Sequence, residues 1–460
     1  MDTKLKKKSN STLATILITL FIILCSAVSQ ASTDVKTLEH IINHKINIEK
    51  LGVGIAVAVI EDDKTNFINI GYANKETRQT VNNKTYFEIG SISKTFTAMA
   101  LASMVNEGKL KLTDPVQLYL PKGVTLPTLN DKPITFLSLA NHTSGLPRLP
   151  SNMAFAIPQN PYADYSVEDM YQFLSNYQLP REVGSTPEYS NLGMGLLGHV
   201  LSLIDKKSYQ TMIQDRVLSP LMMNETFIDI PANEYSKLSQ GYNEQLMPTL
   251  HWQLPALQGA GALKSTIKDL AIYLQESMNK NTLTNEFSLT QTTSANFTTP
   301  NTSIGLAWII DESSGNKIFM HDGGTGGYRS FIGFNEQNQK GIVILANTAI
   351  DMNKIAHAFL TSSLDTVQLN KPIKLTSEQL SKLSGEYELA PSFVLTITNN
   401  GKQLFVQATG QPKLALYSTS ATEFINHAVG AKVTFDTDEQ GKALSLTLHQ
   451  GGQTLPGLKR

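Results

Sequence analysis

Two groups of strand-like segments, separated by a long helical stretch, constrain the fold more than any other feature of this sequence. An apolar run from Val53 to Ile60 and an alternating run from Phe67 to Gly71 flank a polar stretch, which predicts a β-hairpin. From about residue 114 to 229 the pattern is mostly helical. The other predicted strands cover 304–310, 315–320, 328–334 and 341–346, and a helix at about 353–364 follows them. The order predicts an α/β (α+β) domain: a mixed-order antiparallel sheet built from distant segments, with flanking helices and an inserted helical region.

The pattern changes after about Gln368, and beyond Ser377 it consists of short alternating runs separated by turn signals such as Asn400-Gly401. The runs cover 393–398, 403–408, 414–418, 432–436 and 443–449. Such spacing predicts an antiparallel β domain of about 85 residues. It has no evident catalytic cluster, so we expect a structural or binding appendage. The predicted domains are 32–368 and 377–460.

The N-terminus has the pattern of an export signal. Lysines at positions 4, 6, 7 and 8 precede an apolar stretch from Leu13 to Leu24, and Ser29-Gln30-Ala31 offers small residues to a signal peptidase. We expect cleavage after Ala31, a periplasmic or secreted protein, and no stable membrane span afterwards. The alternative is an uncleaved anchor, although the apolar run is short for a span of about 20 residues.

The single cysteine, Cys25, lies inside this signal segment. A mature chain without cysteine has no disulfide, no thiolate nucleophile and no cysteine-ligated metal. The nine histidines are scattered, so we predict no metal and no other cofactor. A formal net charge of −1 argues against nucleic acid or an anionic membrane as the main partner.

The catalytic prediction rests on residues 87–94, Phe-Glu-Ile-Gly-Ser-Ile-Ser-Lys. Ser91 and Lys94 are three residues apart and share one face of a helix, where the amine can activate the hydroxyl. The same Ser-x-x-Lys spacing begins at Ser265, Ser277 and Ser314. Only Ser91 follows a strand-like run and a glycine and also opens a long helical pattern. The alternative is that Ser91 is an ordinary helix N-cap.

A second segment, Tyr189-Ser190-Asn191, precedes an apolar helical run. Tyr189 becomes a plausible base if the Lys94 ammonium lowers the pKa of its phenol. Asn191 offers a carbonyl and an amide that could orient Lys94 and hold a substrate amide. Tyr72-Ala73-Asn74 has the same pattern, but it ends a predicted strand and is interpreted as a surface turn.

The third segment is the glycine-rich stretch from His321 to Tyr328, which follows one predicted strand and leads into another. Glycines such as Gly323 allow backbone to approach a ligand closely. The Gly324 N–H could pair with the Ser91 N–H as an oxyanion hole. His321 could carry a proton or bind a substrate carboxylate. The alternative is a turn without chemistry and a structural histidine.

Together the three segments resemble the serine β-lactamase and penicillin-binding superfamily. Residues 87–94 are similar to the active-site signature of class C β-lactamases, 189–191 resembles their Tyr-Ala/Ser-Asn motif, and His321-Asp322-Gly323 stands where they carry Lys-Thr-Gly. Residues 141–147, Asn-His-Thr-Ser-Gly-Leu-Pro, also resemble a stretch common across the group. The resemblance covers about 45–365, and the C-terminal β domain looks like a small barrel-like domain found in some members.

The resemblance implies a β-lactamase/transpeptidase-like fold and an acyl-serine mechanism. Ser91 would attack the substrate carbonyl, Lys94 and Tyr189 would move the proton, and the Ser91 and Gly324 amides would hold the oxyanion. Asn191, His321 and Gly323 would contact substrate.

Departures from the family pattern leave the substrate open. His321 replaces a lysine, and residues 347–350 keep only the first asparagine of a carboxylate-binding segment. We expect an exported, class C-like serine hydrolase acting on β-lactams. The alternatives on the same site are a D-alanyl-D-alanine carboxypeptidase, an esterase, or a non-enzymatic penicillin-binding sensor that stays acylated. An α/β-hydrolase esterase is disfavoured, because no Gly-x-Ser-x-Gly occurs.

Overall fold

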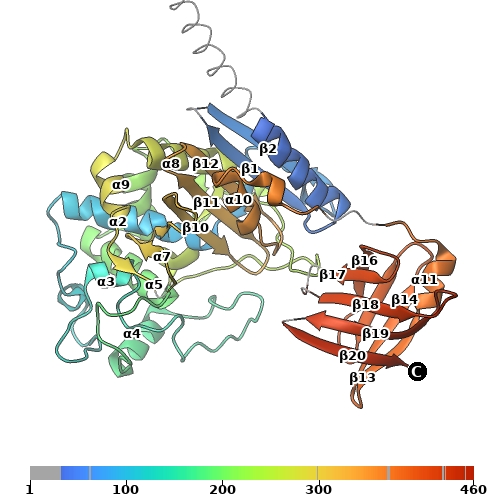
Figure 1. The fold of residues 1–460 in the computed structure, drawn as a ribbon. Helices are drawn as coiled ribbons and strands as arrows, with labels where there is room; N and C mark the ends of the chain where they lie inside the picture. The colour runs from blue at the N-terminus through green and yellow to red at the C-terminus, as the bar shows by residue number, and fades with distance from the viewer. Residues whose placement is uncertain are drawn as a thin grey trace, which may run out of the picture.

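The computed structural model describes residues 33–61, 64–297, 299–369, 373–426, 429, 431–450 and 452–460 (Figure 1). The predicted signal segment, with Cys25, lies outside the described residues. Among the helices in the described ranges, none combines the length and the apolar character needed to cross a membrane.

A nine-stranded antiparallel sheet lies at the centre of residues 33–369, in the order β3-β2-β1-β12-β11-β10-β9-β8-β7 (Figure 1). β1 (Gly54–Glu61) pairs with β2 (Lys64–Asn74) as the predicted hairpin, and on its other side with β12 (Lys340–Ala346). The remaining strands are β3 (Gln79–Thr80), β7 (Ala295–Asn296), β8 (Thr302–Ile304), β9 (Ile309–Asp311), β10 (Ile318–Gly324) and β11 (Arg329–Asn335). The predicted assembly of the sheet from distant segments is confirmed.

α8 (Ile267–Asn279) packs on one face of this sheet and α10 (Asn353–Leu360) on the other (Figure 1). The helices are α2 (Ser93–Asn106), α3 (Phe136–Ala140), α4 (Val167–Asn176), α5 (Asn191–Asp205), α6 (Tyr209–Ile213), α7 (Gln258–Gly261), α8 (Ile267–Asn279), α9 (Thr284–Thr290) and α10 (Asn353–Leu360). A small second sheet joins β4 (Tyr86–Glu88) to β6 (Lys264–Thr266) and β5 (Thr226–Phe227). β4 leads directly into the turn that carries Ser91.

Both faces of β1 are buried, which explains its continuous apolar run. Side chains alternate between the two faces of a strand. Even-numbered residues such as Ala58 therefore pack in the core shared with α2, α5 and α8. Odd-numbered residues such as Val57 pack in a second core beneath α10 and the helix over residues 33–43. The sheet is thus a middle layer with helices on both sides.

Two sequence predictions at the far end of the sheet are wrong. The strand expected over 304–310 is a hairpin of two short strands, β8 and β9, with Ala307 at φ 64° between them. His321-Asp322-Gly323, expected between strands, belongs to β10, because pairing with β11 continues to Gly324. Only residues 325–328 form the turn.

The C-terminal residues form a closed eight-stranded antiparallel barrel with a core of its own (Figure 1). Its strands are β13 (Gly385–Ala390), β14 (Phe393–Asn399), β15 (Leu404–Ala408), β16 (Leu414–Ser418), β17 (Glu423–Asn426), β18 (Ala431–Thr437), β19 (Ala443–Gln450) and β20 (Gln453–Lys459), preceded by α11 (Ser377–Leu383). The antiparallel β architecture is confirmed. The sequence runs had predicted five of these strands, and the family resemblance had indicated a barrel-like domain; neither had indicated α11.

Candidate active site

Ser91 lies in a 3₁₀ turn, Gly90–Ile92, immediately before α2. Gly90 has φ 49°, a conformation that favours glycine. A Cβ at this position would lie 2.7 Å from the Gly324 nitrogen, so the turn packs directly against the backbone at the end of β10. β4 and the glycine together present the Ser91 hydroxyl at the junction of the sheet and the helical layer.

Lys94, in the first turn of α2, is fully buried. Its Nζ lies 2.8 Å from Ser91 Oγ and donates a hydrogen bond to the Ala260 carbonyl in α7 at 2.6 Å. Burial lowers the pKa of Lys94 well below its usual value, and the positive charge of Arg148 lowers it further, against an opposing effect of Asp322. This shift favours the neutral amine, the form that can accept a proton from Ser91.

Two basic side chains lie close to the Tyr189 ring. Lys94 Nζ is 4.8 Å and Arg148 Cζ is 4.9 Å from the ring centroid. Burial raises the pKa of Tyr189, and the hydrogen bond with Ser91 opposes this only in part. The prediction that Lys94 lowers the pKa of this phenol is therefore wrong, because desolvation of the phenolate dominates. Tyr189 is a neutral phenol beside the nucleophile.

Asn191 is the first residue of α5, where the Ser190 side chain caps the helix by accepting the Gly193 N–H at 2.8 Å. Asn191 Nδ2 donates to the Tyr162 hydroxyl at 3.1 Å, whereas Oδ1 is buried without a hydrogen-bond partner. Within the described ranges Asn191 makes no hydrogen bond to Lys94, so the expected steering is not observed. The Ala260 carbonyl orients Lys94 instead.

His321 is buried on the site-facing side of β10, with its ring centroid 6.2 Å from that of Tyr189. Nδ1 donates to the Asp322 carbonyl at 2.6 Å, which leaves Nε2 as the acceptor of a neutral ring. Burial lowers the pKa of His321; the Asp322 carboxylate opposes this and the Lys94 charge adds to it. A neutral His321 is suited to accepting a hydrogen bond and lacks the charge that carboxylate binding favours.

Gly323 packs β10 against the nucleophile turn. A Cβ there would lie 2.2 Å from the Ile89 carbonyl oxygen, which accepts a hydrogen bond from Ser330 Oγ at 2.8 Å. The structure therefore gives Gly323 a packing role in addition to any contact with substrate.

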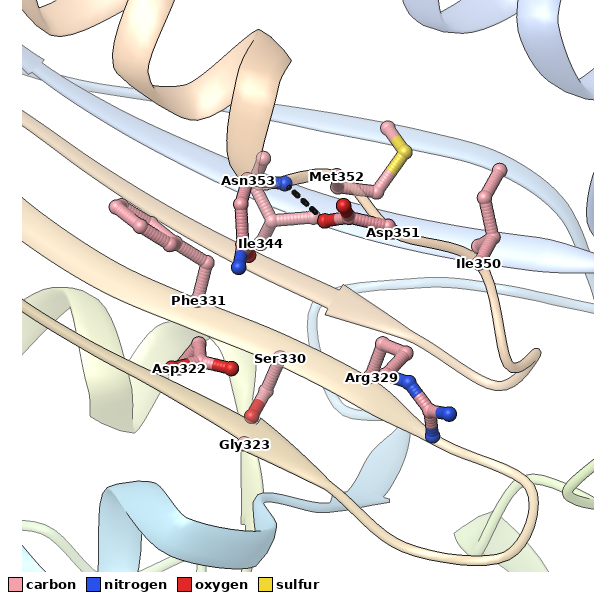
Figure 2. A pocket seen from close by; sticks show the side chains of 10 residues that line it. All are labelled: Asp322, Gly323, Arg329, Ser330, Phe331, Ile344, Ile350, Asp351, Met352 and Asn353. Carbon is pink, nitrogen blue, oxygen red and sulfur yellow. Dashed lines mark hydrogen bonds between the residues drawn. The ribbon is translucent and has the colours of Figure 1, made fainter. Parts of the chain in front are cut away.

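Asp322 points to the opposite face of β10 from His321, since successive strand residues alternate. There it lines a small pocket of about 120 Å³. Figure 2 shows the lining side chains, which include Arg329 and Asp351. Its carboxylate acts on the site through its charge across the strand.

Sequence reasoning missed three site residues: His142, Arg148 and Tyr162. His142 is buried at φ 62°, accepts the Ser190 N–H at Nδ1 (3.2 Å), and its ring centroid is 4.6 Å from that of Tyr189. The motif over residues 141–147 was a signal for His142, and Arg148 follows it directly. Tyr162 had no such signal.

Two other sequence candidates have structural roles. Asn347, from the segment compared with a carboxylate-binding sequence, is buried and its Nδ2 donates to the carbonyls of Tyr72, Ala73 and Gln240. Its amide nitrogen is thus committed to backbone. The second Tyr-x-Asn match, expected to be a surface turn, is instead the end of β2; the turn begins after Asn74, which accepts the Thr77 N–H there.

Comparison with known proteins agrees with this geometry. Residues 47–365 match the family model described as Beta-lactamase, and residues 369–457 match a domain of unknown function (DUF3471). A "Beta-lactamase" of Escherichia coli (strain K12) is 32% identical over 332 residues, which are 64% of this chain and 84% of that protein. The "D-alanyl-D-alanine-carboxypeptidase/endopeptidase AmpH" of the same organism is 26% identical over 340 residues, 70% of this chain and 86% of that protein.

Among solved structures, the fold is similar to that of an octameric penicillin-binding protein homologue from Pyrococcus abyssi. The TM-score is 0.64 at 23% identity, and the match covers 92% of this chain and 100% of that chain. The family match spans more than half of the sequence and includes every residue of the site described above. The chain therefore belongs to the β-lactamase family and is a serine hydrolase of the β-lactamase and penicillin-binding superfamily.

Proposed function

We propose that Ser91 is the nucleophile and that the neutral Lys94 amine is its general base. The 2.8 Å separation between Lys94 Nζ and Ser91 Oγ, in a setting that lowers the lysine pKa, is the observation that carries this proposal. Ser91 Oγ attacks the substrate carbonyl carbon while its proton passes to Lys94. The backbone N–H groups of Ser91 and Gly324 then stabilise the oxyanion.

Tyr189 completes proton transfer in this scheme. Its neutral phenol, hydrogen-bonded to Ser91 and beside Lys94, donates a proton to the leaving nitrogen or oxygen and regains one from Lys94. Water then attacks the acyl-serine, releases the acid and returns the Ser91 hydroxyl. Asn191 and His321 lie beside this path and contact the substrate.

We assign β-lactam amide hydrolysis of the class C type as the first candidate reaction. The segment 87–94 and the 32% identity to a β-lactamase support it. D-Alanyl-D-alanine peptide hydrolysis is the second candidate, because the third motif carries a neutral histidine and a carboxypeptidase/endopeptidase is among the relatives. Ester hydrolysis uses the same acyl-enzyme, and slow deacylation would make the protein a sensor.

We also propose the domain organisation and the location. Residues 1–31 would be a cleaved signal, 32–368 the catalytic domain and 377–460 a separate barrel domain, in a periplasmic or secreted protein. The distinct cores of the two parts support the division.

Ser91→Ala tests the proposal against a chromogenic cephalosporin, a D-Ala-D-Ala peptide and a nitrophenyl ester. Ser314→Ala is the matched control, since Ser314 begins another Ser-x-x-Lys match but is exposed. We expect Ser91→Ala alone to abolish turnover. Activity retained by Ser91→Ala would refute the mechanism. If the wild-type protein turned over only the ester, the β-lactamase assignment would be replaced by an esterase assignment.

A further inference from the structure

The basic groups nearest to the reacting atoms are poorly suited to binding an acidic substrate. Lys94 is buried and held by Ser91 and Ala260, and His321 is neutral. Arg329 lines the pocket of Figure 2 on the opposite face of the sheet, and its Nη1 donates to the carbonyls of Thr325 and Tyr328. A positive charge that binds a substrate carboxylate must therefore come from a residue other than these three.

Arg148 lies beside the site, and hydrogen bonds hold its backbone in place. Its carbonyl oxygen accepts the N–H groups of Asn191 at 3.0 Å and Leu192 at 3.3 Å, which joins it to the start of α5. Its side chain is exposed, and the guanidinium lies over the Tyr189 ring. Arg148 is therefore solvent-accessible and close to the nucleophile at the same time.

The charge of Arg148 has no protein counter-ion in the described ranges, and its guanidinium donates no hydrogen bond there. One face of the guanidinium contacts the Tyr189 ring, so its N–H edge is left to pair with a ligand. A planar guanidinium pairs with carboxylates through two parallel N–H···O bonds. Its charge also reaches the reacting groups, because it lowers the pKa of both Lys94 and Tyr189.

We propose that Arg148 binds the carboxylate of the acylating substrate and makes the site selective for substrates that carry an acidic group. The proposal rests on the proposed acyl-serine function and assigns to residue 148 a task that the third motif, with histidine, does not perform. Substrates of this class include β-lactams with a free carboxylate and peptides with a free C-terminus.

The test compares matched substrate pairs that differ only at the carboxylate. These are a chromogenic cephalosporin with its methyl ester, and N-acetyl-D-alanyl-D-alanine with its C-terminal amide. The measured quantity is the ratio of kcat/KM for the acid to kcat/KM for its neutral partner. Arg148→Gln removes the charge and keeps much of the stem, Arg148→Lys keeps the charge, and Arg78→Gln is a control at an exposed arginine outside the site.

Arg148→Gln should lower the ratio about 10- to 100-fold, the usual effect of losing a hydrogen bond to a charged group. Arg148→Lys should lower the ratio less than Arg148→Gln does, and Arg78→Gln should leave the ratio unchanged. An unchanged ratio in Arg148→Gln overturns the proposal. An equal fall for both substrates overturns it too and makes Arg148 a positioning residue for Tyr189. Activity that survives in Ser91→Ala would instead overturn the proposed function.

Discussion

The substitution Gly90→Ala tests how the nucleophile turn and β10 cooperate. Alanine at φ 49° costs about 1–2 kcal/mol of stability, because the left-handed conformation crowds a Cβ. The added Cβ would also lie 2.7 Å from the Gly324 nitrogen, well inside ordinary contact distance. The neighbour is backbone, so Gly324 or the turn must move, and the proposed oxyanion donor moves with it.

The expected loss is that of one oxyanion donor, about 100- to 1000-fold in kcat. Gly108→Ala separates this effect from strain, because Gly108 also has a positive φ, 71°, but a Cβ there meets nothing within 4 Å. Gly108→Ala should lower the free energy of unfolding by about 1–2 kcal/mol and leave kcat unchanged.

The assay combines steady-state kinetics on the preferred substrate with urea unfolding of wild type and both variants. Gly90→Ala should be at least as destabilised as Gly108→Ala and should lose kcat in addition. If the two variants lose the same stability and keep the same kcat, the Gly324 N–H is not a donor to the oxyanion, and the reasoning fails.

Three further predictions concern the proton path, the pH dependence and the barrel. Tyr189→Phe keeps the ring beside Lys94 and Arg148 but should lower kcat about 100- to 10,000-fold with little change in melting temperature; an active variant would remove Tyr189 from the proton path. Burial lowers the pKa of His321 to about 4, so between about pH 6.5 and that value the unfolded state binds more protons and stability falls as the pH falls. Replacing His321 by Asn should weaken this pH dependence in urea unfolding, whereas an unchanged slope would refute the assignment to His321 and point to His142, whose pKa burial also lowers. Leu446→Ala, in the barrel core, should destabilise the barrel by about 2–5 kcal/mol with kcat unchanged, and a parallel loss of activity would contradict separate domains.

Much of the fold follows from local pattern. The apolar run over 53–60 and the alternating runs of the barrel have the periodicity of strands, and both pair as strands in the structure. The errors arise where pairing with a distant strand determines the local secondary structure. His321-Asp322-Gly323 is glycine-containing and polar enough to suggest a turn, but β11 holds it in the sheet. Barrel closure depends on pairing between β13 and β20, which are far apart in sequence.

In the candidate site, too, local contacts could be predicted from the sequence and contacts between distant segments could not. Ser91 and Lys94 are predictable because their contact is local, within one turn. The Ala260 carbonyl that holds Lys94 is a backbone group 166 residues away, and nothing in its side chain marks it. The Tyr189 pKa was predicted in the wrong direction because burial, which the sequence does not show at this position, outweighs the nearby charges.

Intact-protein mass spectrometry after exposure to a penicillin tests the central claim most directly. Wild-type protein that is quenched with acid during turnover should carry the mass of one penicillin, and peptide mapping should place it on Ser91. Ser91→Ala should gain none, and Ser314→Ala should behave as wild type. An adduct that persists on Ser91→Ala, or that maps to another residue, would contradict the account of Ser91 as the nucleophile activated by Lys94.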